Sequence, residues 1–265
     1  MTIADIDFAA LYRAHMASAG RPKPAQTWDA RADDMNKAGH ASTYVREFID
    51  RIDFSGCSSL LDVGCGTGAI ALAAAPRLRE VLGLDFSSRM LELLQANAAA
   101  SGLAHVRAMQ RAWEDDWRDV PRCDIVVASR STAVTDMDDA LAKLIAKARK
   151  RVYLTSLVGG RFIDPGVFAA IGRPVPPPLP DYIYIINLLH ARGIHPRLDY
   201  IDNNSPDRGA TDFAGLRRMV ERSIGELSVT ESAHLERWHA AQAGRARNSD
   251  TPFKWAFISW DTARA

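Results

Sequence analysis

The chain has 265 residues, of which 47% are hydrophobic and 25% charged, and its formal net charge is +1. A chain of this length can bury one complete α/β core with an elaboration, or one domain with a small cap. A net charge so close to zero supplies no basic field of the kind that dominates nucleic-acid binding, so we expect no nucleic-acid partner. The three cysteines include no C-x-x-C pair, which disfavours a disulfide framework and a zinc site.

The N-terminal part of the chain is predicted to be helical. Apolar residues recur at near-helical spacing over residues 3–19, and a second helix is expected to run up to the turn around Gly56. Asp5 and Asp7 lie where a signal peptide would be basic, and every apolar run is far shorter than the ~20 residues of a membrane span. We therefore expect a cytoplasmic protein with no membrane partner.

A glycine-rich segment, LLDVGCGTGAI, occupies residues 60–70. An apolar run ends there on an acid, three glycines alternate with small residues, and an Ala-rich stretch of helical composition follows. This order predicts a strand, a tight loop and a helix. Glycines let a ligand lie directly on the main chain, and the following helix points its free N–H groups at that ligand. The segment therefore predicts a ligand-binding loop.

Two ligand classes use such a loop. Gly64-x-Gly66-x-x-Ala69, with Asp85 about twenty residues further on, matches the dinucleotide fingerprint and would indicate an NAD(P)-dependent oxidoreductase. Asp62, two residues before the first glycine, favours a different ligand, because a carboxylate suits an ammonium and a sulfonium and suits a pyrophosphate badly. Read as Asp62-x-Gly64-x-Gly66-x-Gly68, the segment resembles the first motif of the class I S-adenosylmethionine (SAM) methyltransferases.

The rest of the chain predicts an alternation of strands and helices. Asp85 ends the second strand, where its two oxygens could accept both ribose hydroxyls; a helix N-terminal acid is the alternative interpretation. The predicted strands after the glycine loop are 80–87, 105–110, 123–131, 151–156, 193–201 and 253–260, and the predicted helices are 88–100, 136–150, 182–191, 212–227 and 230–243.

In motif order, residues 25–156 resemble the class I SAM-dependent methyltransferases of the small-molecule type. The resemblance implies a doubly wound α/β fold, with a mostly parallel seven-stranded sheet and an antiparallel last strand. It also implies an N-terminal helical lid at residues 1–55 and a SAM-binding domain at residues 56–265. A helical insertion at about 205–245 would precede the last strand and form a cap or a homodimer surface.

The resemblance also implies where the cofactor binds. A W-D-x-R-A-like segment would place Trp28 and Arg31 over SAM, with Arg31 or Tyr44 near its carboxylate; Trp28 and Arg31 fit equally well on the solvent edge of a helix pair. Trp113 would hold the adenine, although it also suits a core position. The implied cofactor-binding residues are Trp28, Arg31, Asp62, Gly64, Cys65, Gly66, Gly68, Asp85, Phe86, Ala112, Trp113, Glu114 and Ser129. Arg130 and Ser131 are candidates for the methionine part or the acceptor.

Residues 172–181 are too rich in proline for a helix or a central strand, and we expect a rigid loop whose Asp181 caps the next helix. No histidine spacing indicates a metal site. The lid, this loop and the insertion would enclose a pocket, which favours methyl transfer to a small-molecule acceptor by in-line displacement. An NAD(P)-dependent oxidoreductase and a catalytically silent SAM-binding module stay as alternatives. A general base cannot be ranked among Tyr44, Asp181, His190 and His195, so no catalytic residue is assigned.

Overall fold

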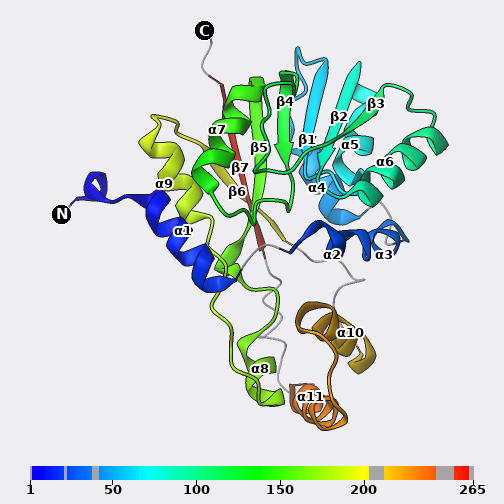
Figure 1. Ribbon diagram of the computed structural model, residues 1–265, viewed down its shortest axis with the longest axis vertical. Helices are drawn as coiled ribbons and strands as arrows, with labels where there is room; N and C mark the ends of the chain where they lie inside the picture. Colours follow the sequence, from blue (N-terminus) through cyan, green and yellow to red (C-terminus); the bar gives the residue numbers. More distant parts are fainter. Residues whose placement is uncertain (1, 21–22, 38–41, 203–211, 243–253, 263–265) are drawn as a thin grey trace.

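A computed structural model describes residues 2–20, 23–37, 42–202, 212–242 and 254–262 of the protein. Within these residues one seven-stranded sheet has the order β3-β2-β1-β4-β5-β7-β6 (Figure 1). The strands are β1 (Ser59–Val63), β2 (Glu80–Asp85), β3 (Val106–Gln110), β4 (Cys123–Ala128), β5 (Ala148–Leu157), β6 (Arg197–Asp202) and β7 (Lys254–Asp261).

Strands β1 to β5 pair in parallel, and β7 is antiparallel to both β5 and β6. The predicted mostly parallel sheet with an antiparallel last strand is therefore confirmed. The strand order reverses between β1 and β4, which lie side by side although β2 and β3 come between them in the chain. In an open α/β sheet, ligands bind beyond the carboxyl ends of the strands at such a switch point.

Helices cover both faces of this sheet (Figure 1). The helices in its two covering layers are α1 (Phe8–Ala19), α7 (Met137–Lys147) and α9 (Ile183–Ala191) on one face, and α4 (Thr43–Asp50), α5 (Ala69–Ala74) and α6 (Ser88–Ala100) on the other. Leu61 and Val63 pack under the first layer, and Leu60 packs under the second. A central strand covered on both sides needs apolar residues throughout, which explains the continuous apolar run before the glycines.

Three helices form a separate cap with its own apolar core at the bottom of Figure 1. These are α8 (Pro165–Ile171), α10 (Phe213–Ile224) and α11 (Val229–Gln242). Phe168, Val220 and Leu235 are buried among them. Arg173 fastens the cap: its guanidinium bonds both carboxylate oxygens of Glu231, at 2.6 and 3.0 Å. The two helices predicted in the insertion are therefore present, and they pack on a third.

Several element boundaries differ from the predictions. Helix α8 was not predicted, although Asp164 accepts a bond from Gly166 N–H as its N-cap and Pro165 takes the first helical position, a combination that marks helix starts. The helix predicted over residues 3–19 is interrupted: a short turn η1 (Ile3–Asp5) comes first, and Asp7 then caps α1. Residues 243–253, which include the start predicted for the last strand, lie outside the described residues.

The prediction that Asp181 caps the next helix is confirmed only in part. The N-cap of α9 is Tyr182, which makes no side-chain capping bond, but Oδ1 of Asp181 accepts the N–H of Ile183, the first residue of the helix, at 3.4 Å. Oδ2 of Asp181 accepts a 2.7 Å bond from Gly159 N–H, beyond the end of β5. Gly160 lies next to it, and its carbonyl accepts the N–H of Leu179 at 2.9 Å. The carboxylate is thus used to fasten the proline-rich loop to the sheet.

We predict that Gly160→Ala destabilises the fold far more than Gly159→Ala. Both glycines have a positive φ, 65° and 72°, but a Cβ on Gly160 would lie 2.0 Å from the Leu179 carbonyl oxygen, whereas one on Gly159 meets no atom within 4 Å. We expect losses of about 3 kcal/mol or more for Gly160→Ala and about 1 kcal/mol for Gly159→Ala, measured by denaturant unfolding. Equal losses in the two variants would contradict this account of the loop.

Candidate functional site

The glycine loop joins β1 to α5 and closes against the end of β2. Gly64, Gly66 and Gly68 all have a positive φ, of 69°, 55° and 98°. A Cβ on Gly64 would lie 2.3 Å from the Cβ of Ser131, so only glycine fits between the loops after β1 and β4. At Gly66 the nearest atom to an added Cβ is the Met90 sulfur, 3.9 Å away. The main chain is therefore open at Gly66, as a ligand cradle requires.

Asp62 lies beneath this loop. Its side chain is buried, and its Oδ2 accepts the N–H of Ala71 in the first turns of α5 at 3.0 Å. Burial is the main reason that the pKa of Asp62 rises to about 7, and the nearby charge of Asp85 adds to it. The carboxyl group predicted to face a cationic ligand thus also fixes the start of the helix that follows the loop.

Asp85 ends β2 and joins two loops. Its Oδ2 accepts the N–H of Gly66 and its Oδ1 accepts the N–H of Ser87, each at 2.9 Å. Burial raises the pKa of Asp85, while these backbone donors act in the opposite direction. Each carboxylate oxygen has a second lone pair, so the group can still accept bonds from a ligand. Phe86, the next residue, is half-buried beside it.

The N-terminal segment packs beside Asp85 through a residue that the sequence analysis did not select. Asp29 of α2 (Ala25–Asp29) accepts a 2.6 Å bond from Ser87 Oγ, and Asp33 of α3 (Ala32–Lys37) pairs with Arg89 at 2.7 Å. Both contacts hold α2 and α3 against α6 (Figure 1). Asp29 was part of the W-D-x-R-A-like segment, but its partner is decided by packing.

The two residues that were selected in this segment have different surroundings. Trp28 is half-buried in α2. Arg31 reaches the cap: its Nη2 donates a 2.6 Å bond to the carbonyl oxygen of Arg222 in α10. The N-terminal segment therefore connects the loop after β2, where Ser87 lies, with the cap.

The loop after β3 is tied to the loop after β4. Trp113 Nε1 donates to the carbonyl oxygen of Ser131 at 3.1 Å, and its ring stacks on Trp117 with centroids 5.4 Å apart. Trp113 also packs against the main apolar core. Ala112 N–H donates to Asp115 at 2.7 Å, so a ligand that used this N–H would have to replace that bond. Glu114 is exposed and accepts a 3.3 Å bond from Thr135.

A hydrogen-bonded cluster lies where β4 and β5 end. The buried Tyr44 hydroxyl is 2.8 Å from Ser129 Oγ and 2.8 Å from Thr155 Oγ1. Thr155 Oγ1 also accepts the N–H of Arg130, whose guanidinium carbon lies 4.4 Å from the centre of the Tyr44 ring. Burial raises the pKa of Tyr44, so its hydroxyl stays protonated. Thr155 was predicted only as part of a strand, because nothing local marks it as a partner of Tyr44.

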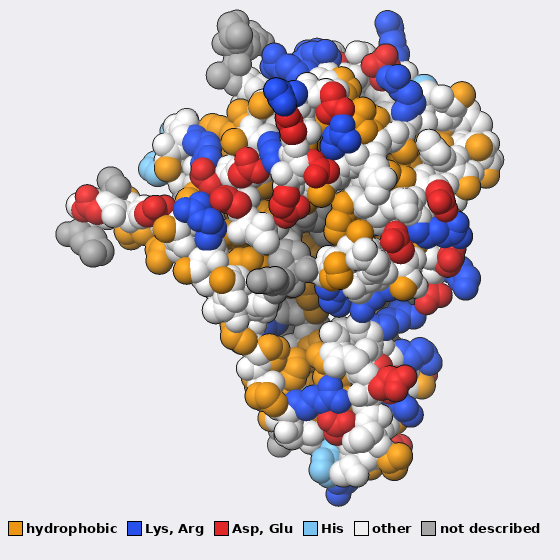
Figure 2. Space-filling model, in the orientation of Figure 1, with side chains coloured by type: hydrophobic (Ala, Val, Ile, Leu, Met, Phe, Trp, Pro, Cys, Tyr) orange, Lys and Arg blue, Asp and Glu red, His pale blue; other side chains and the backbone are white. Residues whose placement is uncertain are grey.

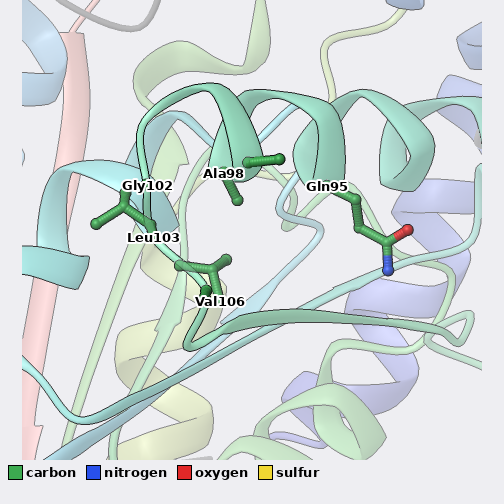
Figure 3. A pocket seen from close by; sticks show the side chains of 7 residues that line it. Gln95, Ala98, Gly102, Leu103 and Val106 are labelled. Carbon is green, nitrogen blue, oxygen red and sulfur yellow. The ribbon is translucent and has the colours of Figure 1, made fainter.

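A small recess of about 40 Å³ adjoins this cluster. It is lined by Tyr12, Met16, Arg130, Thr132, Ala133, Ser156, Leu157, Phe162, Leu179, Pro180 and Trp255. A larger hollow of about 290 Å³ lies between α6 and β3, where Gln95, Ala98, Leu103 and Val106 line it (Figure 3). That hollow is at the end of α6 and the start of β3, opposite the strand end that carries Asp85, and no charged side chain lines it.

Comparisons with known proteins agree with this geometry. A family model described as a methyltransferase domain matches residues 60–152. An uncharacterized protein of Haemophilus influenzae is 39% identical over the whole of both chains. Nocamycin O-methyltransferase of Saccharothrix syringae is 31% identical over 51% of this chain and 44% of its own. The chain belongs to the class I SAM-dependent methyltransferases.

A solved structure shares the fold. The structure of geranyl diphosphate methyltransferase in complex with SAM aligns with a TM-score of 0.52, at 16% identity, over 93% of this chain and 94% of that one. The match of residues 60–152 to a methyltransferase domain, which includes the glycine loop and Asp85, makes the protein an enzyme that uses SAM as its cofactor, and the NAD(P)-dependent alternative is set aside. Within the described residues, no three His, Cys, Asp or Glu side chains are grouped to hold a metal ion, and no helix is long and apolar enough to cross a membrane.

The raised pKa of Asp62 predicts a stability change with pH. The folded state keeps this carboxyl protonated up to about 7, whereas its ordinary pKa is 3.8. Between these values the folded state binds more protons than the unfolded chain, so its contribution to stability falls as pH rises. Asp62→Asn keeps an acceptor for Ala71 N–H but does not titrate. We expect the unfolding free energy of the wild type minus that of Asp62→Asn to fall by up to about 4 kcal/mol between about pH 4 and pH 8.

That difference would be measured by urea unfolding at several pH values. Parallel stability curves for the two proteins would show that Asp62 is ionised in the folded state throughout this range.

The position of Asp85 predicts its effect on cofactor affinity. If its oxygens accept both ribose hydroxyls, Asp85→Ala should weaken binding of S-adenosylhomocysteine about 10- to 100-fold, because two bonds to a charged group are lost. Isothermal titration would measure this. Asp261→Ala is the matched control, because Asp261 also ends a strand but pairs with Arg151. Unchanged affinity in Asp85→Ala would remove Asp85 from the cofactor site, and NAD(H) should give no signal in any variant.

Proposed function

We propose that this methyltransferase transfers the methyl group of SAM to a small molecule bound in the recess beside Arg130. The enclosure of the recess carries the proposal. Its walls come from five separated parts of the chain: α1 through Tyr12, the loop after β4 through Arg130, the end of β5 through Leu157, the proline-rich loop through Leu179, and β7 through Trp255. A recess of about 40 Å³ holds one part of an acceptor between mainly apolar walls, as small-molecule sites usually do.

The charge distribution supports the same acceptor class. On the face shown in Figure 2, Lys and Arg side chains are interspersed with Asp and Glu. A continuous basic face, which a nucleic-acid acceptor would require, is not formed by the described residues of this view. The formal net charge of +1 agrees with this distribution.

The residues of the site fit the cofactor. Bound SAM supplies a methyl group that its sulfonium makes electrophilic. We assign the ribose to Asp85, the adenine to the loop of Ala112, Trp113 and Glu114, and the methionine part to the main chain at Gly64–Gly68 and to Ser129. The open main chain at Gly66 and the free lone pairs of Asp85 support this placement.

The protein's main contribution is then alignment. A displacement at an activated methyl group needs donor and acceptor held in line and water kept out. Asp29 and Arg31 support this by fastening the N-terminal segment to α6 and to the cap. Tyr44 has a raised pKa and so stays protonated, and it contributes a hydrogen-bond donor rather than a general base.

Three earlier expectations stay predictions. The lid at residues 1–55, the cytoplasmic location and a homodimer through the insertion are not decided by the fold. For the homodimer, the apolar faces of α8, α10 and α11 pack on one another within one chain. Light scattering of the purified protein would give its mass in solution.

A fractionated extract tests the acceptor class. Purified enzyme and SAM would be incubated with the low-molecular-weight, protein and RNA fractions of one bacterial lysate, and release of S-adenosylhomocysteine would be measured. We expect release with the low-molecular-weight fraction alone. Activity confined to the protein or RNA fraction would refute a small-molecule acceptor.

A blocking variant tests the recess itself. Ala133 is exposed on the rim of the recess, so Ala133→Trp should fold normally and fill the space. We expect methyl transfer to fall at least about tenfold, since misplacing an acceptor by ~1 Å has effects of this size, while the affinity for S-adenosylhomocysteine stays unchanged. Full activity in Ala133→Trp would place the acceptor elsewhere.

A further inference from the structure

Arg130 has an unusual backbone conformation at the edge of the recess. Its φ is 57°, and it is the one non-glycine residue with a positive φ in the described part of the chain. Such a conformation is energetically unfavourable for a residue with a side chain. The Thr155 hydroxyl, which accepts the Arg130 N–H at 2.9 Å, helps to hold it in place. Glycine would relieve this strain, so an arginine here indicates a use for the side chain.

The guanidinium of Arg130 has a rigid support but no anionic partner. It lies over the ring of Tyr44, with 4.4 Å from its central carbon to the ring centre. Unlike Arg173, which binds Glu231, it takes part in no ion pair or hydrogen bond within the described residues. Its charge lowers the pKa of the buried Asp62 carboxyl, but no ion pair joins the two groups among the described residues. Its charge is therefore left for another anion.

The recess beside Arg130 is otherwise apolar or neutral. Among the described residues that line it, Arg130 is the only one with a charged side chain. Met16, Leu157, Phe162 and Trp255 provide apolar and aromatic walls. One cation beside such walls selects a ligand with an apolar body and a single anionic group, because a guanidinium binds a carboxylate by two parallel hydrogen bonds.

We propose that the methyl acceptor is a carboxylate-bearing small molecule whose anionic group binds Arg130 and whose apolar body packs against the walls of the recess. This proposal rests on the proposed small-molecule function. The methionine carboxylate of the cofactor is a second source of the same chemistry. The acceptor is favoured because Arg130 shares the recess with Thr132, Leu157 and Trp255, whereas the glycine loop is not among the lining residues.

Binding of a carboxylate probe tests the proposal without a known acceptor. Benzoate and its neutral analogue benzamide would be titrated into protein saturated with S-adenosylhomocysteine, so that the cofactor's own carboxylate site is filled. We expect benzoate to bind at least about tenfold more tightly than benzamide, since a charge-assisted bond in a shielded site is worth 1.5–3 kcal/mol.

Arg130→Gly should abolish this preference. The variant suits the positive φ at this position, so it should fold, and its unfolding curve would confirm that. Arg130→Lys should keep part of the preference for benzoate, because it retains the charge but not the two-bond geometry. Arg118→Gly is the control, because Arg118 is exposed and lies outside the recess.

Three results would overturn the proposal. Benzamide could bind as tightly as benzoate, or Arg130→Gly could leave the preference for benzoate intact. Alternatively, Arg130→Gly could weaken the binding of S-adenosylhomocysteine at least tenfold while benzoate binding persists. That result would assign the guanidinium to the cofactor site. Failure of the proposed function has a different signature: methyl transfer would occur only with the protein or RNA fraction, although benzoate binding still depended on Arg130.

Discussion

The bridge made by the Asp85 carboxylate is the interaction on which the cofactor side of this enzyme depends. One oxygen holds Gly66 of the glycine loop and the other holds Ser87 at the start of α6. Two loops that approach from neighbouring strands are thereby set at a fixed distance around an acid that also has lone pairs to offer. Because the group is buried, each bond is stronger than it would be in water, and removal of either partner would leave a polar group unsatisfied.

Contacts from outside the sheet extend this arrangement. Asp29 bonds Ser87, so the N-terminal segment is fastened at the same corner, and Arg31 passes from that segment to the carbonyl oxygen of Arg222 in the cap. The cap has its own apolar core and its own ion pair, Arg173–Glu231, and is therefore a unit in itself.

The proposed acceptor side is organised by different forces. The buried Tyr44 hydroxyl lies within hydrogen-bond distance of Ser129 and Thr155, and the Tyr44 ring packs against the guanidinium of Arg130. Its hydroxyl orders the ends of β4 and β5, while its ring supports a cation that no described acid neutralises. In the proposed arrangement, cofactor and acceptor meet near Ser129. The Asp85 carboxylate lies on the cofactor side, and the Arg130 guanidinium lies on the acceptor side. Opposite charges on the two sides favour a defined orientation of both molecules.

The amino-acid sequence by itself determined the sheet and its glycine loop. An apolar run ending on Asp62, alternating glycines and helix 88–100 are local patterns, since strands, turns and helices are stabilised by residues close in the chain. The tertiary structure decided the partners. Tyr44 meets Thr155 across 111 residues, Asp181 binds Gly159 as well as the start of α9, and Arg130 forms no ion pair among the described residues. A buried polar group bonds whatever packing brings within about 3 Å, and local spacing does not encode that neighbour.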